Sequence, residues 1–296
     1  MHVVRTPGST RAIARTLPRP VGFVPTMGAL HRGHLSLVER ARAENAVVAA
    51  SIFVNPLQFT PGEDFERYPR GFEQDAQMLE AAGVELLYAP SVERMYPPNF
   101  RTSISVRDLG DSFEGAARPG HFLGVATVVA KLLHAVEPTS LYLGQKDVQQ
   151  TAVLRAMIRD LDMATCVVVC ETVRENDGLA LSSRNAYLDP AQRRAAPSLY
   201  RALSAVRTAI AAGETDTVAL RAHGAALIEP PLVLEYLAIV DPQTFAVQAS
   251  AKPPAVIVGV ARAGTTRLLD NLTVPAGDGV DPVLTPLSSP RTNLRS

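Results

Sequence analysis

Short apolar runs alternate with helical patterns over the first 170 residues of the chain. The strand-like runs lie at residues 21–24, 47–54, 84–88, 141–143 and 167–169. The helical patterns lie at 35–45, 71–82, 122–136 and 148–160, and Gly83 is suited to cap the second of them. Apolar strands that alternate with helices predict an α/β fold, a parallel sheet with helices on both faces. Ligands of such sheets bind beyond the carboxyl ends of the strands.

The pattern changes near residue 173. Asp189 and Pro190 predict the start of a long alanine-rich helix that ends near Gly213. A second helix at 217–228 and strands at 234–240, 255–262 and 267–274 follow. We therefore expect an α/β domain over 1–172 and a smaller α+β domain over 173–275. The tail over 276–296 is rich in Gly, Pro, Ser and Asp, and we expect it to be disordered.

Composition narrows the class of protein. The 29 basic and 29 acidic residues balance, which argues against a nucleic-acid partner. No apolar run approaches 20 residues, so no membrane-spanning segment is predicted. Cys166 and Cys170 would lie about 13 Å apart on one strand, too far for a disulfide, and are expected to be reduced core residues. The N-terminal segment is rich in arginine, but it lacks the apolar core of a secretion signal.

The segment from Pro25 to His34, PTMGALHRGH, stands between a predicted strand and a predicted helix. His31 and His34 are three residues apart at the helix start, so both imidazoles should lie on one face of its first turn. Backbone N–H groups and the helix dipole favour an anion there, and Gly28 and Gly33 would let a ligand approach the backbone. Phosphate is the favoured ligand. Zinc and an ordinary histidine pair remain alternatives, since no third zinc ligand is evident nearby.

Three further motifs carry polar groups that suit a phosphorylated or carboxylate ligand. Gly144-Gln145-Lys146-Asp147 follows a strand, as the first motif does, and could otherwise be a routine turn. Leu181-Ser182-Ser183-Arg184 offers hydroxyl and guanidinium donors, or is a linker between domains. Gln58 follows the strand at 47–54, and Gln149 and Gln150 open the helix at 148–160. Asp75 is expected to lie on the solvated face of its helix.

Several common motifs are missing from the chain. It has no GxxxxGK[ST] segment, which excludes a P-loop enzyme. It has no GxGxxG after the first strand and no GxSxG, which argues against a dehydrogenase and an α/β hydrolase.

Taken together, the motifs resemble the pantothenate synthetase family of ATP-dependent ligases, over nearly the whole chain to about residue 274. The matching segments are PTMGALHRGH (25–34), SIFVNPLQF (51–59), HFLGVATVV (121–129), LGQKDVQQ (143–150), TVRENDGLALSSRN (172–185), YLDPAQR (187–193) and ARAGTTRLLDN (261–271). The chain has Gln145 where the family often has glutamate, and Leu181 where it often has methionine.

The resemblance implies a Rossmann-like first domain, a smaller C-terminal lid domain and a cytoplasmic homodimer. It also implies that pantoate and β-alanine are joined at the expense of ATP, with Mg²⁺ as cofactor and pantoyl adenylate as intermediate. Carried over by position, the resemblance implies that His34 is the general acid. The ATP-binding residues carried over by position are Met27, Gly28, Ala29, Leu30, His31, Arg32, Gly33, His34, Gly144, Gln145, Lys146, Asp147, Val173, Leu181, Ser182, Ser183 and Arg184. Gln58 and Gln150 would bind pantoate, and Gln58 would also bind β-alanine.

The chemistry of adenylation agrees with these residue types. Negative charge grows on the phosphates, and His31, His34, Lys146, Ser182, Ser183 and Arg184 can all donate towards it. We expect His34 to act first as a hydrogen-bond donor, because pyrophosphate is already a good leaving group. A nucleotidylyltransferase that joins a nucleotide to a phosphorylated acceptor is the nearest alternative, and a nucleotide sensor or RNA-binding module is a more distant one.

Overall fold

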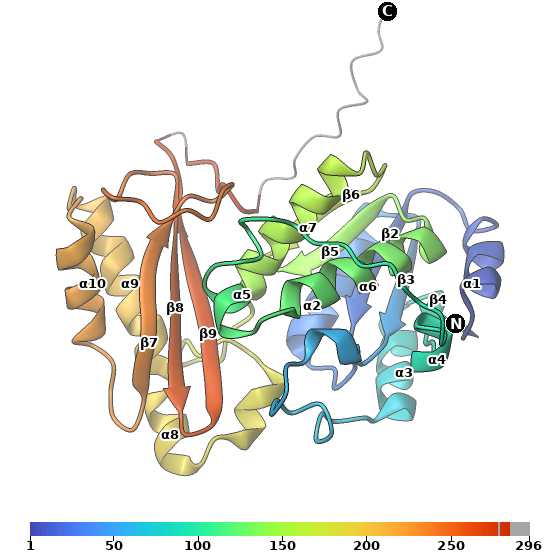
Figure 1. Cartoon of the computed structure of the whole chain (residues 1–296), viewed down its shortest axis with the longest axis horizontal. Coiled ribbons are helices and arrows are strands. Elements are labelled where there is room, and N and C mark those ends of the chain that lie inside the picture. Colours follow the sequence, from blue (N-terminus) through green and yellow to red (C-terminus); the bar gives the residue numbers. More distant parts are fainter. Residues whose placement is uncertain (278, 285–296) are drawn as a thin grey trace, which may run out of the picture. The chain divides into compact units, whose positions relative to one another are not determined.

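The computed structural model describes residues 1–277 and 279–284, and Figure 1 traces the chain. The chain divides into two compact units. The first unit comprises residues 1–143 and 149–170. The second comprises 144–148 and the described residues from 171 onwards. The turn that contains Lys146 therefore groups with the second unit, although its flanking segments belong to the first.

The first unit is built on a six-stranded sheet in the order β1-β4-β3-β2-β5-β6. The strands are β1 (His2–Val4), β2 (Val21–Thr26), β3 (Val47–Ile52), β4 (Leu86–Tyr88), β5 (Ser140–Gly144) and β6 (Cys166–Cys170). The pairings β1/β4, β4/β3, β3/β2 and β2/β5 are all parallel, which confirms the predicted sheet. Strand β1 and helix α1 (Pro7–Ala14) are additional to the predicted elements. Three residues are too few for a recognisable strand pattern, and only Thr10 and Ala14 of α1 are buried, so the helix lacks a clear apolar face.

Helices cover this sheet. The longer ones are α2 (Arg32–Glu44), α3 (Phe72–Ala81), α6 (His121–Val136) and α7 (Val148–Asp160), and the short ones are α4 (Val92–Met95), α5 (Glu114–Ala117) and the 3-10 turn η1 (Pro56–Gln58). Val38 of α2 and Leu79 of α3 pack with Val24, Val48 and Leu87 of the strands in one apolar cluster. Burial of this apolar surface is the main driving force that holds the helices on the sheet.

The register of β2 and β3 brings two predicted motifs to one edge of the sheet. Thr26 and Ile52, the last residues of the two strands, are partners in the ladder. The Phe53 N–H also donates to the Thr26 carbonyl oxygen at 3.0 Å. The loops that begin at residues 27 and 53 therefore start side by side at the carboxyl ends of the strands, where such sheets bind their ligands.

The second unit contains a three-stranded antiparallel sheet of β7 (Val233–Val240), β8 (Ala255–Ala263) and β9 (Thr266–Val274). Figure 1 shows α9 (Pro197–Ala211) and α10 (Thr217–Ala225) next to it. The single helix expected from residue 190 to residue 213 is wrong. It is two helices, α8 (Pro190–Ala195) and α9, because Pro197 has no N–H to continue the hydrogen-bond ladder. The predicted cap holds, since Asp189 accepts from the Ala191 and Gln192 N–H groups.

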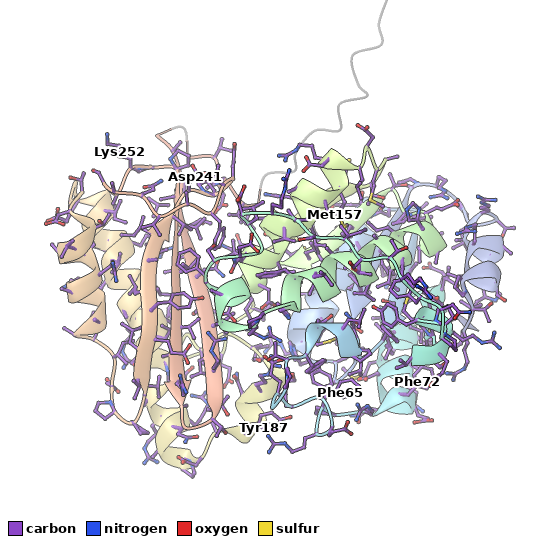
Figure 2. All side chains as sticks on the ribbon, in the orientation of Figure 1. Phe65, Phe72, Met157, Tyr187, Asp241 and Lys252 are labelled. Atoms are coloured by element: carbon purple, nitrogen blue, oxygen red, sulfur yellow. The ribbon has the colours of Figure 1, made fainter. Side chains whose placement is uncertain are left out.

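Carboxylates organise the turns of this unit. Asp241, at the end of β7 in Figure 2, accepts from the N–H groups of Gln243 and Thr244. Asp281 does the same for Val283 and Leu284. The Val283 side chain is only 2% exposed. Residues 278 and 285–296 of the expected tail lie outside the described residues.

The two cysteines are free thiols, and burial raises the pKa of Cys170 to about 11. None of the helices in the described part of the chain is both long and apolar enough to cross a bilayer.

Candidate active site

His31 and His34 form a paired imidazole site at the start of α2. His31 is the N-cap residue, and its Nδ1 accepts from the Gly33 N–H at 3.1 Å. Nδ1 of His34 accepts from the His31 N–H at 3.3 Å, and the two ring centroids are 4.1 Å apart. Because Nδ1 is the acceptor in both rings, each neutral imidazole carries its proton on Nε2. That nitrogen is a donor, as contact with an anion requires.

Asp75 supports the loop that leads to these histidines, so its expected place on the solvated face of a helix is wrong. The residue lies in the first turn of α3 and is 4% exposed. Its Oδ2 accepts from the Ala29 N–H at 2.8 Å and its Oδ1 from the Leu30 N–H at 2.9 Å. One carboxylate therefore binds two consecutive backbone donors, at a spacing of about 45 residues that no local pattern reveals.

This contact also changes the role of Gly28. A Cβ on Gly28 would lie 2.8 Å from Oδ2 of Asp75, and the residue has φ +83°. Ala29 is left-handed too, at φ 52°. Glycine is thus required here for the approach of the Asp75 carboxylate, whereas the sequence suggested the approach of a ligand. The N–H groups of Ala29 and Leu30, two of the residues carried over as ATP-binding, are occupied by Asp75.

The zinc alternative finds no support. Across residues 1–277 and 279–284, three or more His, Cys, Asp or Glu side chains nowhere gather into a group that could hold a metal ion.

Gln58 lies at the end of η1, and a buried neighbour defines its amide orientation. Asn55, 1% exposed, donates from Nδ2 to Gln58 Oε1 at 2.9 Å. The Oδ1 atom of Asn55 accepts from the Leu57 N–H at 3.3 Å and from the Tyr96 hydroxyl at 2.8 Å. A backbone N–H can only donate, so the other amide atom of Asn55, Nδ2, must be the donor. Burial raises the pKa of Tyr96, which keeps that hydroxyl protonated. The Gln58 oxygen is thereby used inside the protein, and its Nε2 supplies N–H donors suited to a carboxylate.

The structure separates the two adjacent glutamines of α7. Gln149 is 5% exposed and holds the segment before α5. Its Nε2 donates to the Leu109 and Ser112 carbonyl oxygens, and its Oε1 accepts from the Glu114 N–H. Gln150 is only half-buried. Of the two, Gln150 is the one whose amide is suited to a ligand.

In the second unit, a buried asparagine holds the turn that carries Lys146. The 3-10 turn η2 (Gln145–Asp147) follows Gly144, the last residue of β5. Nδ2 of Asn271 in β9 donates to the carbonyl oxygens of Gln145 and Lys146, both at 2.9 Å. The Lys146 ammonium lies 3.7 Å from Asp147 Oδ1. The sequence identifies the segment that ends at Asn271 as part of the family resemblance, but it does not predict that Asn271 binds the Lys146 turn.

The loop before the predicted Ser-Ser-Arg segment is held by hydrogen bonds and an ion pair of Arg174. Arg174 makes a two-pronged ion pair with Asp270, at 2.6 and 2.8 Å, and donates to the Gly178 carbonyl oxygen at 3.0 Å. The Leu181 N–H donates to the Val173 carbonyl oxygen at 2.9 Å. Ser182 then caps the 3-10 helix η3 (Ser183–Tyr187) by accepting from the Arg184 N–H. Adjacent residues of β9 thus hold the loop before the Ser-Ser-Arg segment, through Asp270, and the Lys146 turn, through Asn271.

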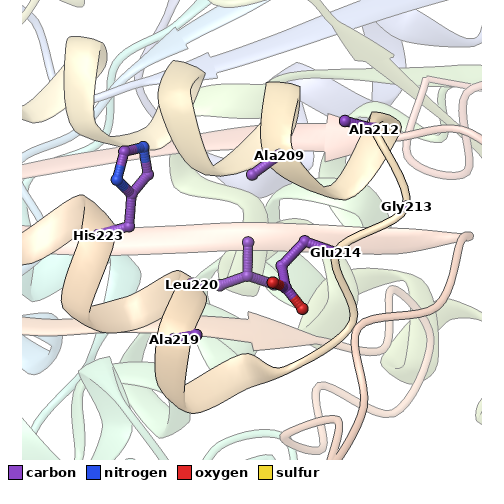
Figure 3. A pocket seen from close by; sticks show the side chains of 7 residues that line it. All are labelled: Ala209, Ala212, Gly213, Glu214, Ala219, Leu220 and His223. Atoms are coloured by element: carbon purple, nitrogen blue, oxygen red, sulfur yellow. The ribbon is translucent and has the colours of Figure 1, made fainter.

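A separate pocket of about 560 Å³ lies between α9 and α10 (Figure 3). Its lining includes Glu214 and His223 but none of the predicted site residues. The Glu214 carboxylate accepts from the N–H groups of Thr215 and Asp216, so it serves the turn between the helices.

An open parallel sheet whose polar loops leave the carboxyl ends of β2 and β3 defines an α/β protein of the ligand-binding, doubly wound class. Residues 2–273 match the model of the pantoate-beta-alanine ligase family. The chain belongs to this family of ligases.

Relatives and solved structures agree with that assignment. A pantothenate synthetase from Herpetosiphon aurantiacus is 52% identical, covering 93% of this chain and all of the relative. One from Thermus thermophilus is 53% identical, covering 92% of this chain and 99% of the relative. A crystal structure of pantothenate synthetase from the same organism has a TM-score of 0.88 at 51% identity, covering 93% of this chain and all of that one. The pantoate-beta-alanine ligase of Francisella tularensis, solved with an ATP compound and β-alanine, has a TM-score of 0.76 at 34% identity, covering 94% and 99%.

Proposed function

We propose that this protein condenses (R)-pantoate with β-alanine at the expense of ATP, giving pantothenate, AMP and pyrophosphate. The observation that carries the proposal is the family match over residues 2–273, which includes every residue given a role below. The F. tularensis relative, solved with an ATP compound and β-alanine, supports the choice of co-substrate and amine.

The reaction has two steps. The pantoate carboxylate attacks the α-phosphorus of ATP, which forms a mixed anhydride, pantoyl adenylate, and releases pyrophosphate. The neutral amine of β-alanine then attacks the acyl carbon, loses a proton and releases AMP. Neither step needs a protein nucleophile, so the catalytic contribution is positioning and stabilisation of charge.

The residues assigned to ATP by the family resemblance include phosphate donors in each unit. In the first unit, the Nε2–H groups of His31 and His34 meet the charge that grows on the phosphates, and the residues around them (Met27, Gly28, Ala29, Leu30, Arg32 and Gly33) form the ATP loop. In the second unit, Lys146, Ser182, Ser183 and Arg184 supply further donors. The supporting segments there are Gly144, Gln145, Asp147, Val173 and Leu181. His34 acts as a hydrogen-bond donor first and as an acid second.

Gln58 and Gln150 bind pantoate, and Gln58 also contacts β-alanine. The fixed orientation of the Gln58 amide supports this role, because its Nε2–H groups can donate to a carboxylate or a hydroxyl. A neutral donor is suitable at this position. A lysine or arginine would pair with the attacking carboxylate and weaken it as a nucleophile.

Magnesium is expected to arrive with ATP. Mg²⁺ commonly binds through substrate phosphates and one or two carboxylates. When bound, it supplies neutralisation of phosphate charge. We also propose a cytoplasmic homodimer, on the family resemblance alone.

Two assays test the proposed function. ATP, Mg²⁺, pantoate and β-alanine are mixed with the protein, and AMP and pantothenate should appear together. ADP in place of AMP would refute attack at the α-phosphorus. In the second assay, exchange of pyrophosphate into ATP should require pantoate but not β-alanine. Exchange that needs β-alanine would refute the two-step order.

A further inference from the structure

The chain around the start of α6 holds the backbone of Gln58. His121 Nδ1 lies 2.8 Å and Arg118 Nη2 lies 3.2 Å from the Gln58 carbonyl oxygen. Arg118 Nη1 lies 3.0 Å from His121 Nε2. A carbonyl oxygen can only accept and a guanidinium can only donate, so Nδ1 of His121 donates and its Nε2 accepts. This is the opposite tautomer to that of His31 and His34.

An ion pair holds Arg118 in turn. Arg118 Nη2 lies 2.8 Å from Glu63 Oε2, and its Nε contacts Oε1 of the same carboxylate. The two side chains are 15% and 21% exposed. Burial by itself would raise the pKa of Glu63, but the hydrogen bonds and charge of Arg118 bring it below its usual value. The pair is therefore ionised at neutral pH, and Arg118 stays in place beside His121.

Gly124, one turn further along α6, allows η1 to lie directly against the helix. A Cβ at this position would be 2.7 Å from the Gln58 nitrogen and would also collide with the Leu57 carbonyl oxygen. The Gly124 carbonyl oxygen accepts from Asn55 Nδ2 at 3.1 Å. Steric fit and hydrogen bonds thus tie the same turn to the same helix face.

We propose that Arg118, His121 and Gly124 are positioning residues that set the Gln58 amide for the carboxylate substrates. The inference rests on the proposed function of Gln58. Its side chain is anchored at Asn55 and its main chain at His121 and Arg118, so the amide nitrogen has little freedom left. Fixing a donor in advance lowers the entropy lost when a substrate binds.

The test compares two substitutions of His121. In His121→Asn, the amide Nδ2 can replace the imidazole Nδ1 as donor to Gln58, whereas His121→Leu offers no donor. We expect His121→Leu to raise KM for pantoate and β-alanine by about tenfold, with KM for ATP changed by less than about twofold. His121→Asn should recover most of the loss. His134→Asn, on the exposed face of the same helix, is the matched control and should change none of these values.

A general structural role would instead raise all three KM values or lower kcat alone, and either result would overturn the proposal. Equal behaviour of the Asn and Leu variants would overturn it too. Should His121→Leu not fold, ¹⁵N NMR of the wild-type protein decides, because a His121 ring protonated on Nε2 contradicts the contacts above. Wild-type protein that makes no pantothenate would refute the proposed function instead. Direct binding of pantoate then still tests the positioning role, because it should be weaker in His121→Leu than in the wild type and in His121→Asn.

Discussion

Asp75→Asn is the most informative single change in the first unit. The substitution keeps the size of the side chain but replaces one carboxylate oxygen with an NH₂ group that cannot accept. One of the two half-buried N–H groups of Ala29 and Leu30 then loses its acceptor. The other keeps a neutral acceptor in place of a charged one.

The magnitude follows from these contacts. A hydrogen bond to a charged group contributes about 1.5–3 kcal/mol, and an unsatisfied buried donor costs a similar amount. The loop also holds Ala29 in a left-handed conformation, which costs about 1 kcal/mol and is tolerated because Asp75 binds it. We expect Asp75→Asn to lower the free energy of unfolding by about 2–3 kcal/mol. If the same energy holds the ATP loop, kcat/KM for ATP falls by about 30-fold to 150-fold.

Urea unfolding measures the first quantity, and pyrophosphate exchange at varied ATP measures the second. Glu73→Gln is the matched control, because Glu73 lies in the same first turn of α3 but is outside the buried set that contains Asp75. It should cost only a few tenths of a kcal/mol through the helix dipole. Normal ATP kinetics in a destabilised Asp75→Asn protein would show that Asp75 supports the fold without ordering the loop. Unchanged stability would refute the account altogether.

Three further predictions concern other parts of the two units. His34→Ala should slow pyrophosphate exchange by about 10²-fold to 10³-fold through the loss of a donor to the phosphates, and a near-normal rate would remove His34 from the chemistry. The lowered pKa of Glu63 means that its pairing with Arg118 stabilises the fold above the unfolded-state pKa and is lost as the pH falls through the folded-state value. Unfolding of Glu63→Gln should thus be easier than that of the wild type at about pH 7, with a smaller difference at about pH 4; a constant difference contradicts this. Asn271→Leu leaves two carbonyl oxygens of the Lys146 turn without their donor, so kcat/KM for ATP should fall by about tenfold or more. An exposed control such as Val218→Leu should have no effect, and unchanged ATP kinetics in Asn271→Leu would show that the turn does not need β9.

The pattern of apolar and polar residues along the chain was sufficient to predict most of the helices and strands. The predicted helix over 148–160 coincides with α7, because its apolar positions repeat with the helical period and a strand precedes it. The predicted cap at Asp189 is also present, since a cap needs only its own neighbours in sequence. The break at Pro197 was missed although the residue was visible, because the apolar pattern continues on both sides of it.

The division between sequence and tertiary structure is clearest at the candidate site. The sequence by itself determined the α/β fold, the family and the segments that carry His34, Gln58 and Lys146, because each depends on short stretches of neighbouring residues. Only the tertiary structure decided which groups hold these segments in place. Asp75, His121 and Asn271 act on backbone atoms between about 45 and 130 residues away, and the backbone is the same at every position. The identity of the residue that contributes the backbone carbonyl or N–H group therefore gives no indication of the distant side chain that binds it.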